Sequence, residues 1–192
     1  MSEQVKIDQN LSLKERVAEF EGIKALVDEF GEIAYDATER YYSSTGYEVG
    51  YDLILKMVRE GSLSRERIRA EPVDTVLRIL TRFFEERGGN QPEFTVEGDT
   101  IQLTTKRSTW CPAPQAIRTV GIEHSDLCFV HKRAFAEGIA TVISEFVPGL
   151  KIQVWNISSR NAPEKGDCTE AYKVIPAWRG RRQPSAASTS TS

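Results

Sequence analysis

Residues 93–105, EFTVEGDTIQLTT, mark the point at which the hydrophobic pattern of the chain changes its period, and they decide the fold class. Phe94, Val96, Ile101 and Leu103 alternate with polar residues on either side of a Glu-Gly-Asp turn. Alternation interrupted by a glycine-containing turn is typical of a β-hairpin. The stretch therefore predicts that a sheet begins here.

The part of the chain before this hairpin is helical in pattern. Apolar residues recur at helical spacing over residues 12–45, where Gly22 and Gly31 are candidate break points. Two further helices are expected, over residues 47–62 and 73–89, because each has an apolar stripe and ends at glycine. The first half of the chain is therefore predicted to be all helix.

A helix and two more strands are expected after the hairpin. The helix covers residues 125–146 and is stopped by Pro148-Gly149. The strands cover residues 150–158 and 169–175, and a polar loop ending in Gly166-Asp167 joins them. This order predicts an α+β fold: an antiparallel four-stranded sheet with helices on one face.

These elements predict one domain over residues 12–175, with a helical part at 12–90 and a second part at 91–175. Residues 1–11 are expected to be a flexible N-terminus. Residues 176–192 are polar and low in complexity, and we expect a disordered tail there.

Composition limits the classes of function. The chain has 192 residues, 40% of them hydrophobic, and 25 basic and 28 acidic residues give a formal net charge of −3. Because the charges are well mixed and no basic stripe stands out, the sequence predicts no nucleic-acid partner. No apolar run reaches the roughly 18 residues of a membrane span, and the N-terminus has no signal-peptide pattern. We expect a cytoplasmic protein with no membrane contact.

The stretch EHSDLCFVHKRAF, residues 123–135, contains both histidines of the chain and one of its three cysteines. On a helix, His124, Cys128 and His131 stand at i, i+4 and i+7, so they project from one face. Thiolate and imidazole are ligands that suit zinc. The spacing therefore makes this face a candidate metal site.

The cysteines have other readings. Cys111 and Cys168 fall at element boundaries, where loop and helix ends can converge on one point. In a reducing compartment the three cysteines are thiols, and each can equally be a small buried hydrophobe. A metal-free alternative uses Cys128 as a nucleophile near a helix N-terminus, with His124 or His131 as its base.

The segment from Cys111 to Val174 resembles the 4-vinyl reductase–like domain and the related L-2-amino-thiazoline-4-carboxylic acid hydrolase–like proteins. The shared features are a Cys-Pro pair after a strand, a second cysteine at the start of a long helix, a further strand, and a Gly-Asp turn before a final strand with a cysteine. In this chain they correspond to Cys111-Pro112, Cys128, and Gly166-Asp167-Cys168. The resemblance covers about a third of the chain.

The resemblance implies an α+β fold of the kind shared with heme-NO-binding and TRAPP transport domains, which are often dimeric through a helical face. It also implies a zinc site and a small-molecule pocket between helices and sheet. We therefore expect residues 91–175 to form a metal-binding part, and the chain to be a homodimer or a subunit of a larger complex. The expected zinc ligands are drawn from Cys111, His124, Cys128, His131 and Cys168.

Two departures from the family pattern matter. The family turn G-D-x-x-C places its last cysteine where this chain has Glu170, two residues after Cys168. Positions two apart on a strand face the same side, so either residue can take the ligand role. The vinyl-reductase version also has an extra cysteine near the end of the preceding strand, which this chain lacks. His124 or His131 could fill the coordination position that this absence leaves open.

The leading functional hypothesis is a zinc-dependent hydrolase that opens a C–N or C=N bond of a small substrate, such as a carboxylate-bearing cyclic amidine. Zinc would activate its bound water, and Glu123, Asp126 or Glu170 could act as the general base or hold a ligand histidine in its tautomer. The cations nearest in sequence for a substrate carboxylate are Arg118, Lys132 and Arg133, although a solvated helix face is the favoured interpretation of each.

Two alternatives come from other classes. One is a non-enzymatic sensor or accessory subunit whose metal is structural and whose pocket binds a small ligand or partner. The other is an interaction module resembling TRAPP subunits, with its cysteines in the core. Three protein ligands plus water would favour catalysis, and four would favour a structural metal.

The aromatic residues could line a ligand pocket or pack in the core or in a dimer interface. Trp155 is expected in the core, and core or dimer packing is the favoured role of the tyrosines at 35, 41, 42, 47 and 51.

Overall fold

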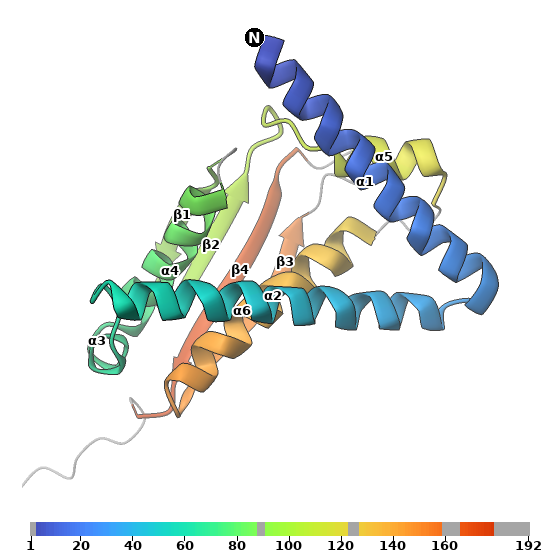
Figure 1. The fold of residues 1–192 in the computed structure, drawn as a ribbon. Helices are drawn as coiled ribbons and strands as arrows, with labels where there is room; N and C mark the ends of the chain where they lie inside the picture. Colours follow the sequence, from blue (N-terminus) through green and yellow to red (C-terminus); the bar gives the residue numbers. More distant parts are fainter. Residues whose placement is uncertain (1–2, 88–90, 123–126, 159–165, 179–192) are drawn as a thin grey trace, which may run out of the picture.

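The computed structural model describes residues 3–87, 91–122, 127–158 and 166–178, with side chains in these ranges except at 3–10, 87 and 128–130. One long helix crosses in front of a sheet, and a second long helix lies at one end of the molecule (Figure 1). The elements in chain order are α1 (Glu3–Phe30), α2 (Ile33–Arg59), α3 (Arg65–Ala70), α4 (Pro72–Arg87), β1 (Glu93–Glu97), β2 (Thr100–Thr105), α5 (Ala113–Val120), α6 (Leu127–Phe146), β3 (Leu150–Ser158) and β4 (Cys168–Pro176).

The sheet has the strand order β1-β2-β4-β3, and each neighbouring pair is antiparallel. β1 and β2 form the predicted hairpin, with Gly98 at φ 60° in its turn, a conformation that favours glycine because it has no Cβ. β4 lies between β2 and β3, so the last strand of the chain joins the hairpin to the strand that follows α6. The predicted α+β class with an antiparallel four-stranded sheet is confirmed.

One face of the sheet bears the main hydrophobic core. Ile101 and Leu103 of β2 face the same side as Tyr172 and Val174 of β4, and all four are buried. Helices α4 and α6 pack against the sheet, and the alternate β3 residues over 151–157 that point away from this core are exposed. The buried stripe of α4 repeats at helical spacing through Val76, Ile79, Leu80 and Phe83.

Helices α2 and α6 cross in close contact (Figure 1), because each helix places a glycine against the backbone of the other. A Cβ added at Gly46 of α2 would lie 2.0 Å from the carbonyl oxygen of Phe135. A Cβ added at Gly138 of α6 would lie 2.1 Å from the carbonyl oxygen of Ser43. The crossing is also bridged by an ion pair, in which Arg133 Nη2 lies 2.7 Å from Glu39 Oε1.

A second, smaller hydrophobic cluster joins α1 to α5 and to the start of α6. Its buried members are Phe20 and Ile23 of α1, Ala113 and Ala116 of α5, and Leu127 of α6. α1 therefore packs on α5 and on the first turns of α2, and not on the sheet (Figure 1).

Glycine positions explain where the helical predictions differ from the structure. Of the two candidate breaks in the helical stretch 12–45, the one at Gly31 is confirmed, because Gly31 adopts φ 70° and ends α1. Gly22 lies within α1 and does not break it. The predicted break near residue 46 was wrong, since α2 continues through Gly46 to Arg59. Here the close approach of α6 requires glycine inside a helix.

Other differences lie at element ends and connections. α3 and α5 were not predicted, and α5 occupies the proline-rich connection after Cys111. α1 already includes residues from Glu3 onward, inside the segment expected to be flexible. Trp178 lies within the segment expected to be a tail, yet it packs on the core and its Nε1 donates to the carbonyl of Arg69 at 3.3 Å. Trp155, expected in the core, is 38% exposed.

Candidate functional site

A carboxylate lies inside the main core, beneath α6. Glu170 of β4 is 2% exposed and is in register with Leu103 of β2 and Asn156 of β3. Its side chain points to the core-facing side of the sheet, as Leu103 does. A charged carboxylate in such surroundings costs free energy unless it is paired, so its partners decide its state.

Two groups contact one oxygen of this carboxylate. Tyr172 Oη donates a hydrogen bond to Glu170 Oε2 at 3.1 Å, and Lys132 Nζ of α6 lies 3.6 Å from the same oxygen. No group among the described residues donates a hydrogen bond to the other oxygen, Oε1. Burial raises the pKa of Glu170, and the nearby Lys132 charge opposes this rise only in part. Burial beside Glu170 likewise raises the pKa of Tyr172 well above its usual value.

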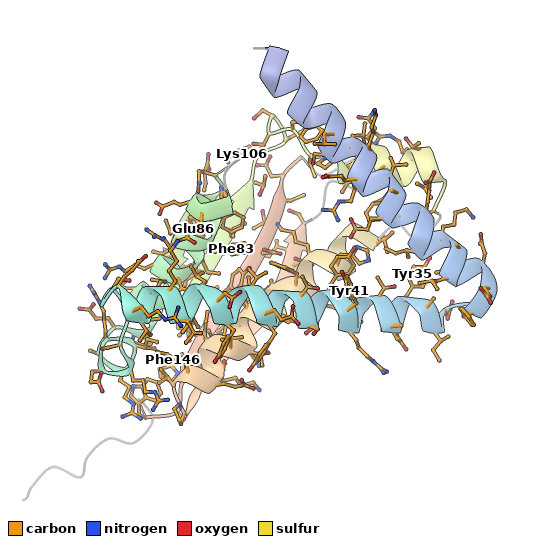
Figure 2. The ribbon with its side chains drawn as sticks, in the orientation of Figure 1. Tyr35, Tyr41, Phe83, Glu86, Lys106 and Phe146 are labelled. Atoms are coloured by element: carbon orange, nitrogen blue, oxygen red, sulfur yellow. The ribbon has the colours of Figure 1, made fainter. Side chains whose placement is uncertain are left out.

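Cys168 lies on the same face of β4 as Glu170, two residues nearer the end of the strand. It is in register with Thr105, and it is half-buried where Glu170 is fully buried. The prediction that these two residues share one side of the sheet is confirmed. At the same end of the sheet, Lys106 follows β2 and pairs with Glu93 at 3.0 Å and Asp167 at 3.6 Å (Figure 2). We call Glu170, Tyr172, Lys132 and Cys168 the Glu170 cluster.

Tyr172 was not predicted as part of any site. Its position two residues after Glu170 on a strand places both side chains on one face, so strand alternation alone could have found it. Lys132 was one of three candidate cations for a substrate carboxylate, and its partner in the structure is the chain's own Glu170. Arg133 instead pairs with Glu39 and Glu137, and Arg118 is exposed on α5.

His131 packs in an aromatic environment between three helices. It is 6% exposed, its ring is stacked on Tyr42 of α2 with centroids 3.9 Å apart, and the ring of Phe20 of α1 lies 5.7 Å away. Next to it on α6, Lys132 reaches towards the sheet, because neighbouring helix residues point about 100° apart. The described contacts of His131 are therefore those of a core side chain.

The predicted zinc ligands fall into separate places. Cys111 packs against the α1–α5 cluster, whereas Cys168 belongs to the Glu170 cluster. Among the described residues, no three His, Cys, Asp or Glu side chains come together in a way that could hold a metal ion. Glu123, His124 and the side chain of Cys128 lie outside the described residues, so their catalytic and ligand roles stay predictions.

The outer face of α2 is a second candidate site. Large apolar side chains are exposed there, including Ile33 at 68%, Tyr51 at 49% and Tyr41, which Figure 2 labels, at 67%. They belong to positions that repeat at steps of four or three residues, which is the spacing of one helix face. We call these positions the α2 stripe: Ile33, Ala37, Tyr41, Ser44, Glu48, Tyr51, Leu55 and Val58.

The tyrosines thus divide between two roles. Tyr42 stacks on His131, and Tyr47 packs against the main core and donates from Oη to Glu145 at 2.7 Å. Tyr41 and Tyr51 belong to the exposed α2 stripe. The first pair confirms core packing for part of the tyrosine set.

Comparison with known proteins finds a likeness to a solved structure. No protein-family model matches the sequence, and no curated protein is similar to it. The structure is similar to that of trafficking protein particle complex subunit 3 from Naegleria fowleri, which was solved with palmitic acid covalently bound. The TM-score is 0.50 at 13% sequence identity, over 88% of this chain and 96% of the other. The likeness is one of fold.

No helix within the described part of the chain combines the length and apolar character that crossing a membrane requires.

Proposed function

We propose that this chain is a non-enzymatic subunit of a larger protein assembly, and that it forms a homodimer through the α2 stripe. The observation behind the proposal is the row of exposed apolar side chains on α2, with Ile33 and Tyr41 each more than 60% exposed. A monomeric soluble protein rarely leaves such a contiguous row uncovered. The Naegleria fowleri protein of similar fold is itself described as a subunit of a complex.

The α2 stripe lies on the side of α2 that is exposed among the described residues. The opposite face of α2 already packs on α6 through Gly46 and Gly50 and on the main core through Leu53 and Met57. An outer face that only met water would tolerate charged residues at every position, yet Glu48 is the one charged member of the stripe. The apolar choice at Tyr41 and Tyr51 therefore favours a protein partner.

The dimensions of α2 suit a helix-to-helix interface. Its 27 residues extend over about 40 Å at the usual helical rise. Pairing along this length approaches the interface size of stable complexes, about 800 Å² per partner. Seven of the eight positions of the stripe are uncharged, so a second copy would meet mostly uncharged side chains along it.

The test is the mass of the protein in solution. We expect sedimentation equilibrium at about 100 µM to give a dimer for the wild type and a monomer for Tyr41→Glu/Tyr51→Glu, because buried charge disrupts an apolar interface. Ala18→Glu/Ala25→Glu on α1 adds the same charge at exposed positions and should leave the dimer intact. A monomeric wild type would refute the homodimer, as would a double variant that still pairs.

The zinc-dependent hydrolase acting on a C–N or C=N bond is the second candidate. It is favoured by Glu170, a buried carboxylate whose Oε1 has no hydrogen-bond donor among the described residues, with a thiol at Cys168 on the same face. Thiolate and carboxylate are both zinc ligands. These two donors do not complete a site, so a metal would also need donors such as His124 or Cys128.

Metal content separates the two candidates. Elemental mass spectrometry on untagged protein should find about one zinc per chain if the hydrolase candidate holds, and Cys128→Ser or Cys168→Ser should lose it. Cys111→Ser serves as the control, because Cys111 packs against the α1–α5 cluster. Wild-type protein purified without chelator and found to contain no metal would exclude the zinc hydrolase and leave the subunit proposal untouched.

A further inference from the structure

The strand β3 forms one edge of the sheet and faces a groove. β3 pairs with β4 along one side, and no other strand among the described residues pairs with it. Beside it lies an open groove of about 610 Å³. Its strand wall is formed by residues 152–155, and its helix wall by Ser43 of α2 with Glu137 and Thr141 of α6. We call this feature the β3 groove.

A nine-residue edge strand is a ready template for another strand, because its outward backbone groups are those a new strand would pair with. Proteins blunt such edges with prolines, several charges or covering segments. β3 has no proline, and Lys151 is its one charged residue. Trp155 and Ile157 are 38% and 46% exposed on the face of β3 that points away from α6.

One acidic residue, Glu137, lines the helix wall of the groove, and a second, Glu145, lies beyond this lining on the same helix. Glu137, Thr141 and Glu145 follow each other at steps of four on α6, so they lie along one side of the helix. Glu137 Oε1 lies 3.5 Å from Arg133 Nε, and Glu145 Oε2 accepts from Tyr47 Oη at 2.7 Å. Each carboxylate keeps capacity for a further donor, because it can accept several hydrogen bonds.

The spacing of the two glutamates matches a strand. Eight residues separate Glu137 from Glu145, which is about 12 Å along a helix. Four residues of a strand span about 13 Å, so side chains at i and i+4 of an extended segment beside β3 would stand opposite the two carboxylates. The residues between them would point to the other face of the sheet, on which Trp155 and Ile157 are exposed.

We propose that the β3 groove binds an extended segment of another protein, which adds a strand to the sheet and alternates basic with apolar side chains. Backbone hydrogen bonds to β3 give the affinity, and the side chains give the specificity. Basic residues at i and i+4 of the segment meet Glu137 and Glu145. Apolar residues at i+1 and i+3 pack beside Trp155 and Ile157.

Charge argues for a foreign segment over a second copy of β3. In β3 the residues on the helix-facing side are Ile152, Val154 and Asn156, and its one base, Lys151, faces the other way. A second β3 would therefore bring no base to the two glutamates. It would also bring the partner's own acidic wall close to the first. This surface is separate from the α2 stripe, so the two proposals can fail independently.

A synthetic peptide tests the groove. The probe is the nine-residue segment Thr-Val-Lys-Val-Thr-Val-Lys-Val-Thr with a fluorescent label, whose lysines stand four residues apart. Fluorescence anisotropy should show saturable binding, and Glu137→Gln/Glu145→Gln should weaken it at least ten-fold. The matched control is Glu21→Gln/Glu29→Gln, two exposed acids with the same spacing on α1, which should bind as the wild type does. Circular dichroism checks that each variant is folded.

Two altered peptides isolate the parts of the contact. Glutamate in place of both lysines should abolish binding, and N-methylation of the backbone amides that face β3 should do the same. No binding of the lysine peptide at about 1 mM would overturn the proposal, and so would equal binding of the glutamate peptide. Unchanged affinity for the N-methylated peptide would also overturn it, since strand addition requires those amides.

Discussion

Glu170 occupies a position where the alternation of β4 calls for an apolar side chain. Its neighbours on the same face, Leu103 and Tyr172, are core residues, and Lys132 is the one cation that reaches it among the described residues. A buried carboxyl group of this kind is more readily protonated than an exposed one. The protonation of Glu170 therefore makes the stability of the folded chain depend on pH.

Glu170→Gln should flatten the dependence of stability on pH. Because burial raises the pKa of Glu170 above 4.5, the folded chain binds this proton more readily than the unfolded chain. Stability from this group is therefore present below about pH 4.5 and is lost as pH rises through the raised pKa. Glutamine still accepts from Tyr172 and carries no charge, so we expect the variant to exceed the wild type in free energy of unfolding at about pH 8.

Urea denaturation followed by circular dichroism between about pH 5 and pH 8 measures this effect. Glu21→Gln, at an exposed position on α1, is the control and should follow the wild type at every pH. A Glu170→Gln variant that loses stability with pH as steeply as the wild type would contradict the prediction.

The surroundings of His131 could not be predicted from the spacing of residues within its own helix. The spacing of His124, Cys128 and His131 predicts a common helix face, but it contains no information on what covers that face. In the structure, Phe20 and Tyr42 come from two other helices, more than eighty residues earlier in the chain, and enclose the imidazole of His131. Contacts of such long sequence separation leave no periodic signal within residues 123–135.

At the scale of elements, the glycines between α2 and α6 should be irreplaceable. Gly46→Ala and Gly138→Ala each place a methyl group about 2 Å from a backbone oxygen of the facing helix. Backbone cannot move aside as a flexible side chain can, so each variant should lose on the order of 3 kcal/mol of stability or fail to fold. Chemical denaturation measures the loss.

Gly22→Ala is the matched control for these substitutions. Gly22 also lies inside a helix, but nothing stands within 4 Å of an added Cβ. Alanine should therefore stabilise the protein by about 0.5–1 kcal/mol through its higher helix propensity. Destabilisation of similar size in all three variants would show that the α2–α6 crossing is not the cause.

Helices and strands with a clear hydrophobic periodicity could be predicted from the sequence. Features that depend on contacts with other elements could not. The hairpin, α4, α6 and the last two strands have strong periodicity and lie close to their predicted bounds. Gly46 was misread as a break, since only the backbone of α6 explains it. α5 was missed because its eight residues follow Pro112 in a segment whose prolines favour a loop.

At the scale of the whole molecule, the two proposed surfaces could not be predicted from the sequence alone. Periodicity indicates that a helix or strand is half-buried, but it does not show which strand ends up at the edge of the sheet. β3 is an edge because β4 inserts between β2 and β3. Likewise, Tyr41 and Tyr51 are exposed because α2 meets α6 through its glycine face.

The division of the apolar side chains into two clusters predicts two levels of stability. Among the described residues, the main core contains nineteen buried residues from helices and sheet, and the α1–α5 cluster contains five. A small cluster holds its helices with less buried apolar surface, so it should open at lower free energy than the whole molecule unfolds. Native-state hydrogen exchange should therefore find the amides of α1 and α5 less protected than those of β2, β4 and α6.

Phe20→Ala tests directly whether the α1–α5 cluster opens independently of the main core. Phe20 is 1% exposed at the centre of the smaller cluster, so its truncation should cost about 3–5 kcal/mol of local stability. Protection should fall in α1 and α5, while the amides of β2 and β4 exchange as in the wild type. Ile79→Ala in the main core is the counterpart: it should lower the protection of the amides of β2, β4 and α6, which exchange by global unfolding, and leave the local opening of α1 and α5 unchanged. If the amides of α1 instead exchanged with the free energy of global unfolding, and Phe20→Ala lowered every amide equally, the two clusters would form one cooperative unit.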